Sequence, residues 1–194
     1  MPQRAPSDRL PRVPGPAHPV RMAACLALLA FPAGVTAQET FDPEARLAAL
    51  GVTLPEPGPD RAAFDRAVRT GNLVFLAGHG PCGEWDGEAR GKVPSVRSVE
   101  EATLAARQVA ICLLGSLEAE IGDLARVRRI VRVFGMVNAD ADFTGHSQVM
   151  NGASELLNEV FGERGRHVRA AVGMGSLPGD LTVEIEMVVE VDGG

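Results

Sequence analysis

Two charged residues stand out in the C-terminal stretch GRHVRAAVGMGSLPGDLTVEIEMVVEV, because one lies inside an apolar run that reads as a β-strand and the other is a carboxylate at the start of the next such strand. Arg169 lies in the first run, and Glu184 lies near the start of the second. A guanidinium group offers a planar set of N–H donors that fits a carboxylate, and a carboxylate can take a proton from water. The pair could hold a small anionic ligand beside an activated water, or it could form an ordinary cross-strand ion pair.

Side-chain alternation predicts the face that each of these residues occupies. In the predicted strand 167–174, the even-numbered residues Val168, Ala170, Val172 and Met174 would face the helices, and Arg169 would lie on the other face. In the predicted strand 182–191, the apolar odd-numbered residues would face the helices and Glu184 would not. If the two strands pair antiparallel, Arg169 and a glutamate of the last strand share a face and converge on a cleft.

Capping signals and apolar periodicity predict the helices that must support these strands. Asp42 would cap a short helix over 43–50. Ser98 with Glu101 forms a capping box that opens a helix ending near residue 121. A further helix over about 147–161 carries a continuous apolar stripe.

The remaining apolar runs predict strands. A hairpin turns near residues 71–72 and leads into a strand over 73–77, and a β-branched run predicts a strand over 127–137. The order is therefore two or three strands, helix, strand, helix and two strands. It predicts an α+β fold in which two helices pack on one face of a mixed sheet.

The first residues differ in composition from the rest of the chain. A basic, proline-rich leader precedes the apolar run 22–31, and small residues follow it, which is typical of a secretory signal peptide cleaved after Ala37. The apolar run is about half the length of a membrane span. We therefore predict a leader over 1–37, a helix and linker over 38–60, and a domain over 61–194. The mature protein would be periplasmic or secreted and free of the membrane. If the segment is not removed it would be an uncleaved tail, and if translation starts at Met22 the protein could be cytoplasmic.

Charge and aromatic content disfavour nucleic acid as a partner. The net charge is −6, so a phosphate backbone would be repelled on average, and the chain has no tyrosine and one tryptophan for stacking on bases. Export would permit a disulfide, but the sequence leaves open whether Cys82 and Cys112 pair. Cys112 falls on the apolar face of its predicted helix, where a buried thiol is usually inert.

Four motifs resemble the YjgF/RidA family, also called L-PSP endoribonuclease-like, which has a chorismate-mutase-like fold. They are TGNLVFLAGHGP, the helix opened by SVEEA, NGASELLNEVFGERGRHVRAAVG, and SLPGDLTVEIE. The N-terminal ARLAALGVTLPEP is similar to a subgroup of the family that has an additional N-terminal helix. The resemblance implies a homotrimer with a cleft between each pair of subunits, and no metal or organic cofactor.

The resemblance also implies roles for individual residues. Arg169 would bind the carboxylate of the substrate, Gly78 would offer a backbone N–H, Asn151 would lie near the cleft, and Glu184 would activate the attacking water. The implied reaction is the hydrolysis of reactive 2-enamine or 2-imino acids to 2-keto acids and ammonia. An imine carbon is already electrophilic, so positioning and one base can suffice.

The chain departs from the family pattern at positions that concern substrate choice. Phe64 stands where many active members have a tyrosine, Ala77 and His79 flank the matching glycine, and Ala171 stands where a cysteine is frequent. His79 could contact the ligand, although a lone histidine in a glycine-rich loop is more often incidental. Besides a deaminase, the sequence therefore allows a trimeric binding protein for small carboxylates, and less readily an endoribonuclease.

Overall fold

The computed structural model describes residues 41–58, 63–85 and 89–193. The predicted leader over 1–37, with its cleavage position, lies outside these residues. The described residues belong to one compact unit that includes the predicted N-terminal helix and linker as well as the region from residue 61 onward.

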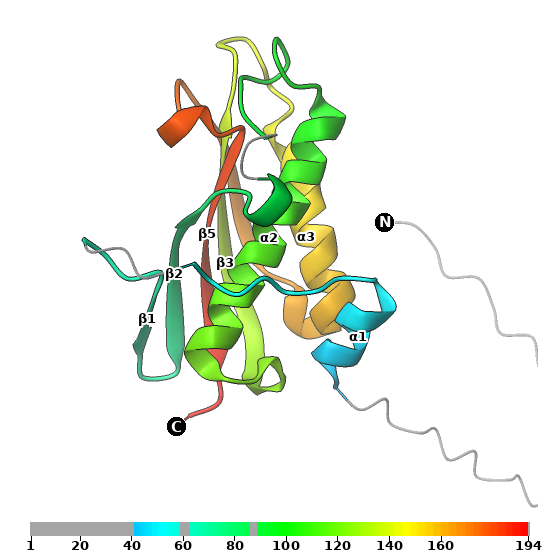
Figure 1. Ribbon diagram of the computed structural model, residues 1–194, viewed down its shortest axis with the longest axis vertical. Helices are drawn as coiled ribbons and strands as arrows, with labels where there is room; N and C mark the ends of the chain where they lie inside the picture. The colour runs from blue at the N-terminus through cyan, green and yellow to red at the C-terminus, as the bar shows by residue number, and fades with distance from the viewer. Residues whose placement is uncertain (1–40, 59–62, 86–88, 194) are drawn as a thin grey trace, which may run out of the picture. The chain divides into compact units, whose positions relative to one another are not determined.

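A five-stranded mixed sheet forms one layer of the fold (Figure 1). The strands are β1 (Ala67–Thr70), β2 (Leu73–His79), β3 (Val127–Asn138), β4 (Val168–Met174) and β5 (Val183–Val191). Their order across the sheet is β1-β2-β5-β3-β4. All neighbours pair antiparallel except β3 and β4, which are parallel and are joined through a helix. The α+β fold predicted from the sequence is confirmed.

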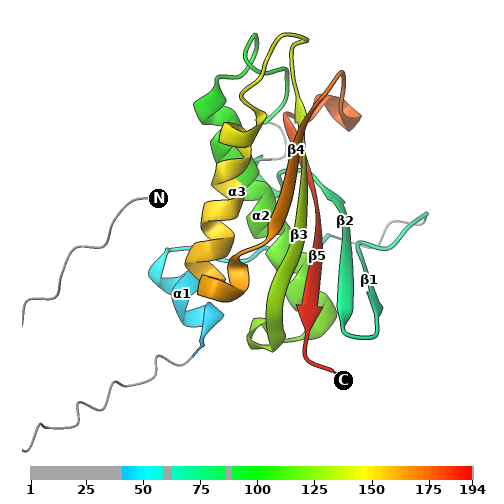
Figure 2. The ribbon, with the colours of Figure 1, turned by 180° about the vertical axis from the view of Figure 1, so that it is seen from behind.

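Helices cover one face of this sheet (Figures 1 and 2). They are α1 (Pro43–Ala49), α2 (Val99–Ile121) and α3 (His146–Phe161), with short 3-10 turns at Gly83–Trp85, Leu124–Arg126, Gly162–Gly165 and Pro178–Asp180. The helix α2 packs on β2 and β5, α3 packs on β3 and β4, and α1 packs against α3. The two long helices are close to the predicted ranges.

Side-chain caps explain where α1 and α2 begin. The Asp42 carboxylate accepts a hydrogen bond from the Ala45 backbone N–H at 2.8 Å. The Ser98 hydroxyl accepts from the Glu101 N–H at 3.1 Å, and the Glu101 carboxylate accepts from the Ser98 N–H at 2.8 Å. Both predicted caps are confirmed, and each satisfies N–H groups that the first turn leaves without a helical partner.

The helix α2 is long and apolar enough to resemble a membrane span, but it is the central core helix of this fold. Its most apolar 18-residue window is 61% buried inside the protein. The apolar side chains of β5 face the helix layer, as predicted: Val183, Ile185, Met187, Val189 and Val191 are all almost fully buried.

Two predictions about β4 are wrong. First, β4 does not pair with β5, because β3 lies between them and pairs with both. Second, the predicted faces of β4 are reversed. Val168 is 67% exposed on the face that the helices do not cover, whereas Arg169 makes hydrogen bonds to α3. Arg169 and Glu184 therefore lie on opposite faces of the sheet within one chain.

Candidate functional site

The carboxyl group of Glu184 lies directly against the backbone of Gly78. A Cβ atom at position 78 would be 2.0 Å from Glu184 Oε1 and 3.0 Å from its Cδ. Glu184 is on β5 and Gly78 is near the end of β2, where the pairing of the two strands shifts between Leu76 and His79. The strand irregularity and the absent side chain together make the space that the carboxyl group occupies. Two predicted site residues are thus in contact.

The environment of Glu184 raises the pKa of its carboxyl group above the usual range. The main cause is burial, which disfavours the charged form, and the nearby negative charge of Glu186 acts in the same direction. A carboxyl group with a raised pKa is a better proton acceptor near neutral pH than an ordinary glutamate. This property suits the role of a general base.

A cavity of about 580 Å³ opens beside Gly78. Phe64, Gly78 and His79 line it together with the segment 55–58, the loop 80–83 and the turn 178–181. Glu184 is not among the lining residues, but it contacts the wall at Gly78. Phe64 precedes β1 and is 51% exposed. Three predicted ligand-binding residues, Phe64, Gly78 and His79, therefore line one cavity. Together with Glu184 we call them the carboxyl cluster.

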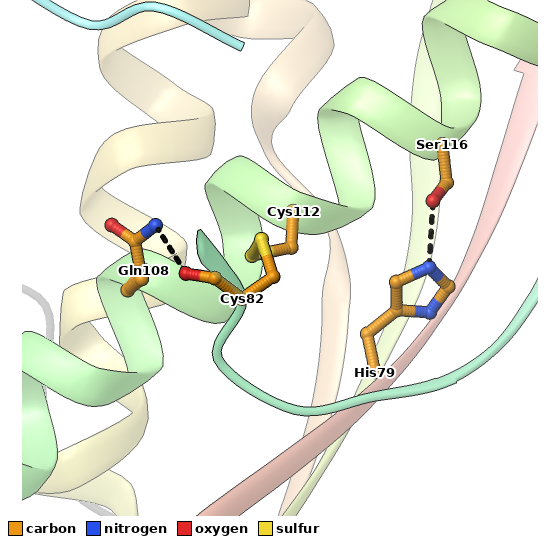
Figure 3. The surroundings of a disulfide bond; sticks show 5 residues. All are labelled: His79, Cys82, Gln108, Cys112 and Ser116. Carbon is orange, nitrogen blue, oxygen red and sulfur yellow. Dashed lines mark hydrogen bonds between the residues drawn. A yellow bond between two sulfur atoms is a disulfide. The ribbon is translucent and has the colours of Figure 1, made fainter. Parts of the chain in front are cut away.

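The end of β2 and the loop that follows it are attached to α2 by a disulfide and by hydrogen bonds (Figure 3). Cys82 and Cys112 form a disulfide, which answers the question that the sequence left open and corrects the expectation of an inert thiol at Cys112. One helical turn away, the His79 ring nitrogen Nε2 lies 2.8 Å from the Ser116 hydroxyl. His79 is 7% exposed, so it acts in the described chain as a buried part of the cavity wall.

The guanidinium group of Arg169 is held by α3. Its Nη1 donates hydrogen bonds to Asn151 Oδ1 at 3.1 Å and Ser154 Oγ at 3.0 Å, and its Nη2 donates to the Ser147 carbonyl at 3.2 Å. These residues lie on one face of α3 because they are spaced by three to four positions. The predicted residues Arg169 and Asn151 are therefore brought together, and we call Arg169, Asn151, Ser154 and Ser147 the guanidinium cluster.

His167 joins the edge of the guanidinium cluster and was not predicted as a site residue. Its Nε2 lies 3.0 Å from Ser154 Oγ, and its Nδ1 lies 2.6 Å from the Gly165 carbonyl oxygen. Burial lowers its pKa, and the positive charge of Arg169 acts in the same direction, against the hydrogen bond to Gly165. The signal in the sequence was the spacing of the small polar residues Ser147, Asn151 and Ser154 at intervals of four and three positions, which places them on one face of α3.

The two clusters do not meet within one chain. They lie on opposite faces of the sheet, and β5 and β4 are separated by β3, so about 10 Å lies between the two strand axes. The predicted convergence of Arg169 and Glu184 on a cleft between paired strands is therefore wrong for the described part of a single chain. Among the residues that the structure describes, no group of three or more His, Cys, Asp or Glu side chains could hold a metal ion.

The fold and sequence match one protein family over most of the chain. Residues 44–188 match the family described as YjgF/chorismate mutase-like, putative endoribonuclease. The protein TCP17 of Trypanosoma cruzi is 36% identical over 149 residues, which are 76% of this chain and 93% of TCP17.

Solved structures agree with this match. The crystal structure of Atu1372 from Agrobacterium tumefaciens, a protein of unknown function, is 38% identical with a TM-score of 0.71, over 77% of this chain and 92% of that one. A putative endoribonuclease from Shewanella oneidensis is 27% identical with a TM-score of 0.74, over 77% of this chain and 99% of the other. The YjgF protein of Escherichia coli, at 22% identity and a TM-score of 0.50 over 71% of this chain and 95% of that one, shares the fold.

Proposed function

Because the chain belongs to the YjgF/chorismate mutase-like family, we propose that it is a hydrolytic deaminase of reactive 2-enamine and 2-imino acids, which it converts to 2-keto acids and ammonia. The observation that carries this proposal is the Glu184 carboxyl group, which lies against Gly78 at the wall of a cavity and has a raised pKa. A partly buried proton acceptor at the wall of a cavity suits water activation.

The active cleft of the proposed enzyme forms between two copies of the chain. Since the carboxyl cluster and the guanidinium cluster cannot meet within one chain, Arg169 of a neighbouring copy would face Glu184. The sheet face without helices supports assembly, because Val68, Phe75 and Val168 expose 52%, 45% and 67% of their surface there. Apolar side chains gathered on one sheet face are typical of a subunit interface. We propose a homotrimer with three such clefts, as the family resemblance implies.

The reaction needs one water, and both protons of that water pass through Glu184 to nitrogen. Arg169 pairs with the substrate carboxylate and fixes the imine carbon near Glu184. The ionised Glu184 takes a proton from water as the water oxygen bonds to the imine carbon. Glu184 passes that proton to the imine nitrogen, which gives an amino alcohol. Glu184 then takes the proton of the new hydroxyl group and passes it to the same nitrogen as the carbon–nitrogen bond breaks, so that ammonia leaves and the carbonyl forms. No redox partner is required, because carbon keeps its oxidation state.

A coupled assay tests the proposal. An L-amino-acid oxidase generates the imine, and release of the keto acid is followed with and without the protein. We expect Glu184→Gln to lower kcat/KM about a hundredfold or more, in the range of a lost general base. Glu190→Gln removes the same charge from the same strand and should leave the rate unchanged. Keto-acid release that is equal in wild type and Glu184→Gln would contradict the proposal.

Arg169 requires a separate comparison. Arg169→Ala should raise KM and lower kcat/KM, because the substrate carboxylate loses its charged partner. Arg129→Ala, which removes an exposed arginine from the far end of β3, is the matched control. If Arg169→Ala and Arg129→Ala have the same KM and kcat/KM, the proposal that Arg169 binds the substrate carboxylate is contradicted.

A second candidate function is a trimer that binds small carboxylic acids without converting them. Phe64, Ala77 and His79 favour it, because they replace polar residues that many active family members carry. Thermal shifts with 2-keto acids in the absence of any imine hydrolysis would support this alternative. An endoribonuclease is disfavoured by the acidic net charge; RNA cleavage that survives purification and is lost in Glu184→Gln would restore it.

We propose that the protein works in the periplasm or outside the cell after loss of the leader. The disulfide between Cys82 and Cys112 supports this location, because such bonds persist in oxidising compartments and are rare in the cytosol. N-terminal sequencing of the exported protein should find residue 38 as the first residue. A chain that keeps its leader in the cytosol would contradict the proposal.

A further inference from the structure

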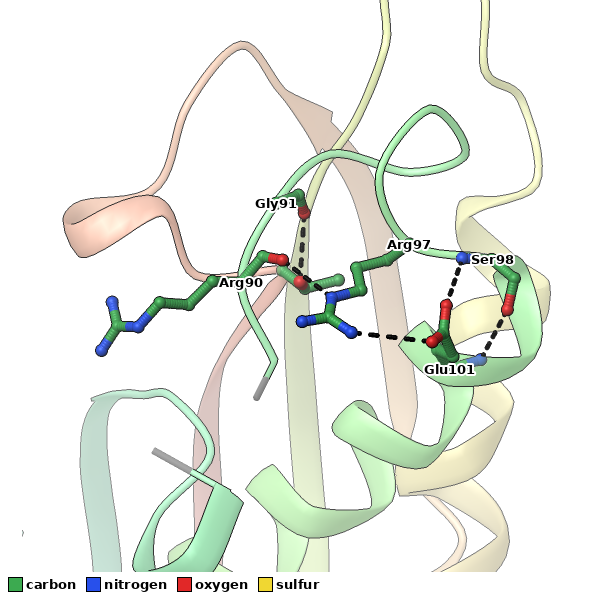
Figure 4. A network of polar contacts seen from close by, with 6 residues as sticks. Arg90, Gly91, Arg97, Ser98 and Glu101 are labelled. Carbon is green, nitrogen blue, oxygen red and sulfur yellow. Dashed lines mark hydrogen bonds and ion pairs between the residues drawn. The ribbon is translucent and has the colours of Figure 1, made fainter. Parts of the chain in front are cut away.

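Arg169 is held by a different kind of acceptor from an arginine that forms an ion pair within the chain. In the network at the start of α2, the Arg97 Nε donates to the Arg90 carbonyl at 2.9 Å, and the Arg97 Nη1 lies 3.6 Å from the Glu101 carboxylate (Figure 4). Within the described residues, Arg169 donates only to neutral oxygens of α3 and pairs with no carboxylate. Neutral acceptors orient a guanidinium group without cancelling its charge.

The contacts of Arg169 with α3 also leave donors for a ligand. A guanidinium group has five N–H donors, and the hydrogen bonds to the described residues account for three of them, two from Nη1 and one from Nη2. The Nε–H and the second N–H of Nη2 take no part in these bonds. A bidentate carboxylate contact uses two N–H donors of one guanidinium group. The orientation of this group therefore decides where a substrate carboxylate can bind.

His167 extends the network behind Arg169 through hydrogen bonds whose direction follows from the chemistry of the groups. A guanidinium group only donates, so Ser154 Oγ accepts from Arg169 Nη1 at 3.0 Å. A carbonyl only accepts, so the His167 Nδ1 that lies 2.6 Å from the Gly165 oxygen carries a proton. In a neutral imidazole the other nitrogen, Nε2, then accepts from the Ser154 hydroxyl at 3.0 Å. Each group donates to the next, from the guanidinium group to the Gly165 carbonyl.

The surroundings of His167 favour this neutral form and fix the end of the network. Burial lowers the pKa of the imidazole, the hydrogen bond to Gly165 acts against it, and the positive charge of Arg169 acts in the same direction as burial. Gly165 itself packs on α3, because a Cβ there would be 2.2 Å from the Leu157 carbonyl oxygen. The last acceptor in the network is therefore part of a fixed backbone.

Strand geometry explains why His167 and Arg169 reach the same serine. His167 directly precedes β4, and Arg169 lies two positions further along the chain. Side chains two positions apart in an extended chain point to the same face, which here is the face covered by α3. Ser154 on α3 contacts both side chains.

Loss of the imidazole acceptor would change what the Ser154 hydroxyl does. A hydroxyl that donates a hydrogen bond becomes a better acceptor, because the bonds in such a chain polarise one another. Without an acceptor at position 167, the hydroxyl would turn to a carbonyl of the preceding helical turn, as serines in helices commonly do. Arg169 would then be oriented mainly by Asn151 and Ser147.

We propose that His167 is a positioning residue for the substrate carboxylate: through Ser154 it holds the Arg169 guanidinium in the orientation that presents its two remaining donors. This inference rests on the proposed function, which supplies the carboxylate at Arg169. His167 does not touch the substrate in this role, and it acts as a hydrogen-bond acceptor without adding charge.

Calorimetry with pyruvate, a simple 2-keto acid, tests the role without requiring turnover. On the assembled protein, His167→Phe keeps an aromatic ring and removes the acceptor, so Kd should rise about two- to tenfold, the range of one hydrogen bond. His167→Gln retains a side-chain oxygen that can accept from Ser154, and it should restore most of the affinity. Asn158→Ala, which removes an exposed polar group one helical turn from Ser154, is the control and should leave Kd unchanged. Equal affinity of wild type and His167→Phe, or no rescue by glutamine, would overturn the positioning role.

A double-mutant cycle separates positioning from a general contribution to stability. Ser154→Ala should weaken pyruvate binding about as much as His167→Phe, and the combined variant should be no weaker than Ser154→Ala, because both changes break the same chain of bonds. In an Arg169→Ala background, His167→Phe should have no further effect on Kd. Losses that add in either background would overturn the proposal.

NMR of the wild-type protein gives a measurement that needs no substitution. The 15N signals of the His167 ring should show a neutral imidazole with its proton on Nδ1 at neutral pH. A cationic ring, or a neutral ring protonated at Nε2, would overturn the positioning role even if the variants do not fold.

Turnover separates failure of this inference from failure of the proposed function. In the coupled imine assay, His167→Phe should raise KM with little change in kcat. Imine hydrolysis whose KM is the same in wild type and His167→Phe would retain the deaminase and overturn the positioning role. Pyruvate affinity that depends on His167 and Ser154, without hydrolysis of any imine, would support the positioning role and overturn the deaminase. Absence of pyruvate binding to wild type would overturn the positioning role.

Discussion

The carboxyl cluster and the guanidinium cluster are built in different ways. Arg169 is oriented by three hydrogen bonds that its guanidinium group donates to α3, so its position is fixed before a ligand arrives. Glu184 is placed by steric fit against Gly78, and within the described residues its carboxyl group has no hydrogen-bond or ion-pair partner. Preorganised donors suit a binding group, whereas a poorly solvated carboxyl group suits a proton acceptor. The difference in construction therefore matches the difference in proposed role.

The two clusters also differ in how the segments that carry them are attached to the helices. The loop next to the carboxyl cluster is joined covalently to α2 through Cys82 and Cys112, and the guanidinium cluster has only hydrogen bonds. The first cluster should therefore depend on the redox state of the protein and the second should not.

Removal of the disulfide should have the largest effect. Cys82→Ser/Cys112→Ser should lower the free energy of unfolding by about 3–4 kcal/mol, because the bond closes a loop of 30 residues. Denaturant unfolding measures the loss, and wild type in reductant should match the variant. Hydrogen exchange should become faster in residues 80–83 and remain unchanged in β4. Similar acceleration in both regions would contradict the difference between the clusters.

Gly78→Ala should be the next most severe change, and it acts on the steric fit. The new methyl group would overlap the Glu184 carboxyl group, which must rotate away, so kcat/KM should fall by about a hundredfold, as for loss of the base. Gly175→Ala is the control, since a Cβ there would have no atom within 4 Å. Normal activity of Gly78→Ala would show that catalysis does not require the observed position of the Glu184 carboxyl group against Gly78.

Asn151→Ala should have a moderate effect, confined to substrate binding. Arg169 would keep its hydrogen bonds to Ser154 and Ser147 and lose one, so KM should rise about two- to tenfold with little change in kcat. Asn158→Ala, an exposed asparagine two turns further along α3, should have no effect. An effect of Asn151→Ala on kcat alone would argue against orientation of Arg169 as its role.

Glu186→Gln should have the smallest effect, a displacement of the pH profile. The charge of Glu186 contributes to the raised pKa of Glu184, so its removal lowers that pKa. Glu184 then ionises at lower pH, and the acidic limb of kcat/KM against pH should move to lower pH. Glu190→Gln should leave the limb in place. A shift to higher pH would contradict the assignment of Glu184 as the base.

Local signals predicted the elements well because the causes of those elements are local. The capping residues Asp42, Ser98 and Glu101 act within one helical turn, and the apolar stripe of α3 is visible in the sequence alone. The contact of Gly78 with Glu184 joins residues far apart in sequence and was not predicted; only the family resemblance implied that both residues belong to one site.

The faces of β4 could not be predicted from alternation. A period of two separates two sets of residues, but it does not say which set faces the helices. Val168 suggested a core position, yet it lies on an apolar sheet face without a helix layer. The pairing of β4 with β3 is likewise long-range, and it comes from the crossover through α3. A polar stripe on α3 opposite Arg169 was the available signal for the correct face.

The segment 55–58 lies outside the sheet and the two long helices, yet it forms part of the cavity wall. It follows α1, crosses α2 so closely that a Cβ at Gly115 would be 2.3 Å from the Pro55 carbonyl oxygen, and then lines the cavity. A shortened chain that starts at residue 61 would keep the whole sheet and both long helices but lose one side of its binding hollow. Recombination or truncation near this point would therefore alter ligand selection before it altered the architecture.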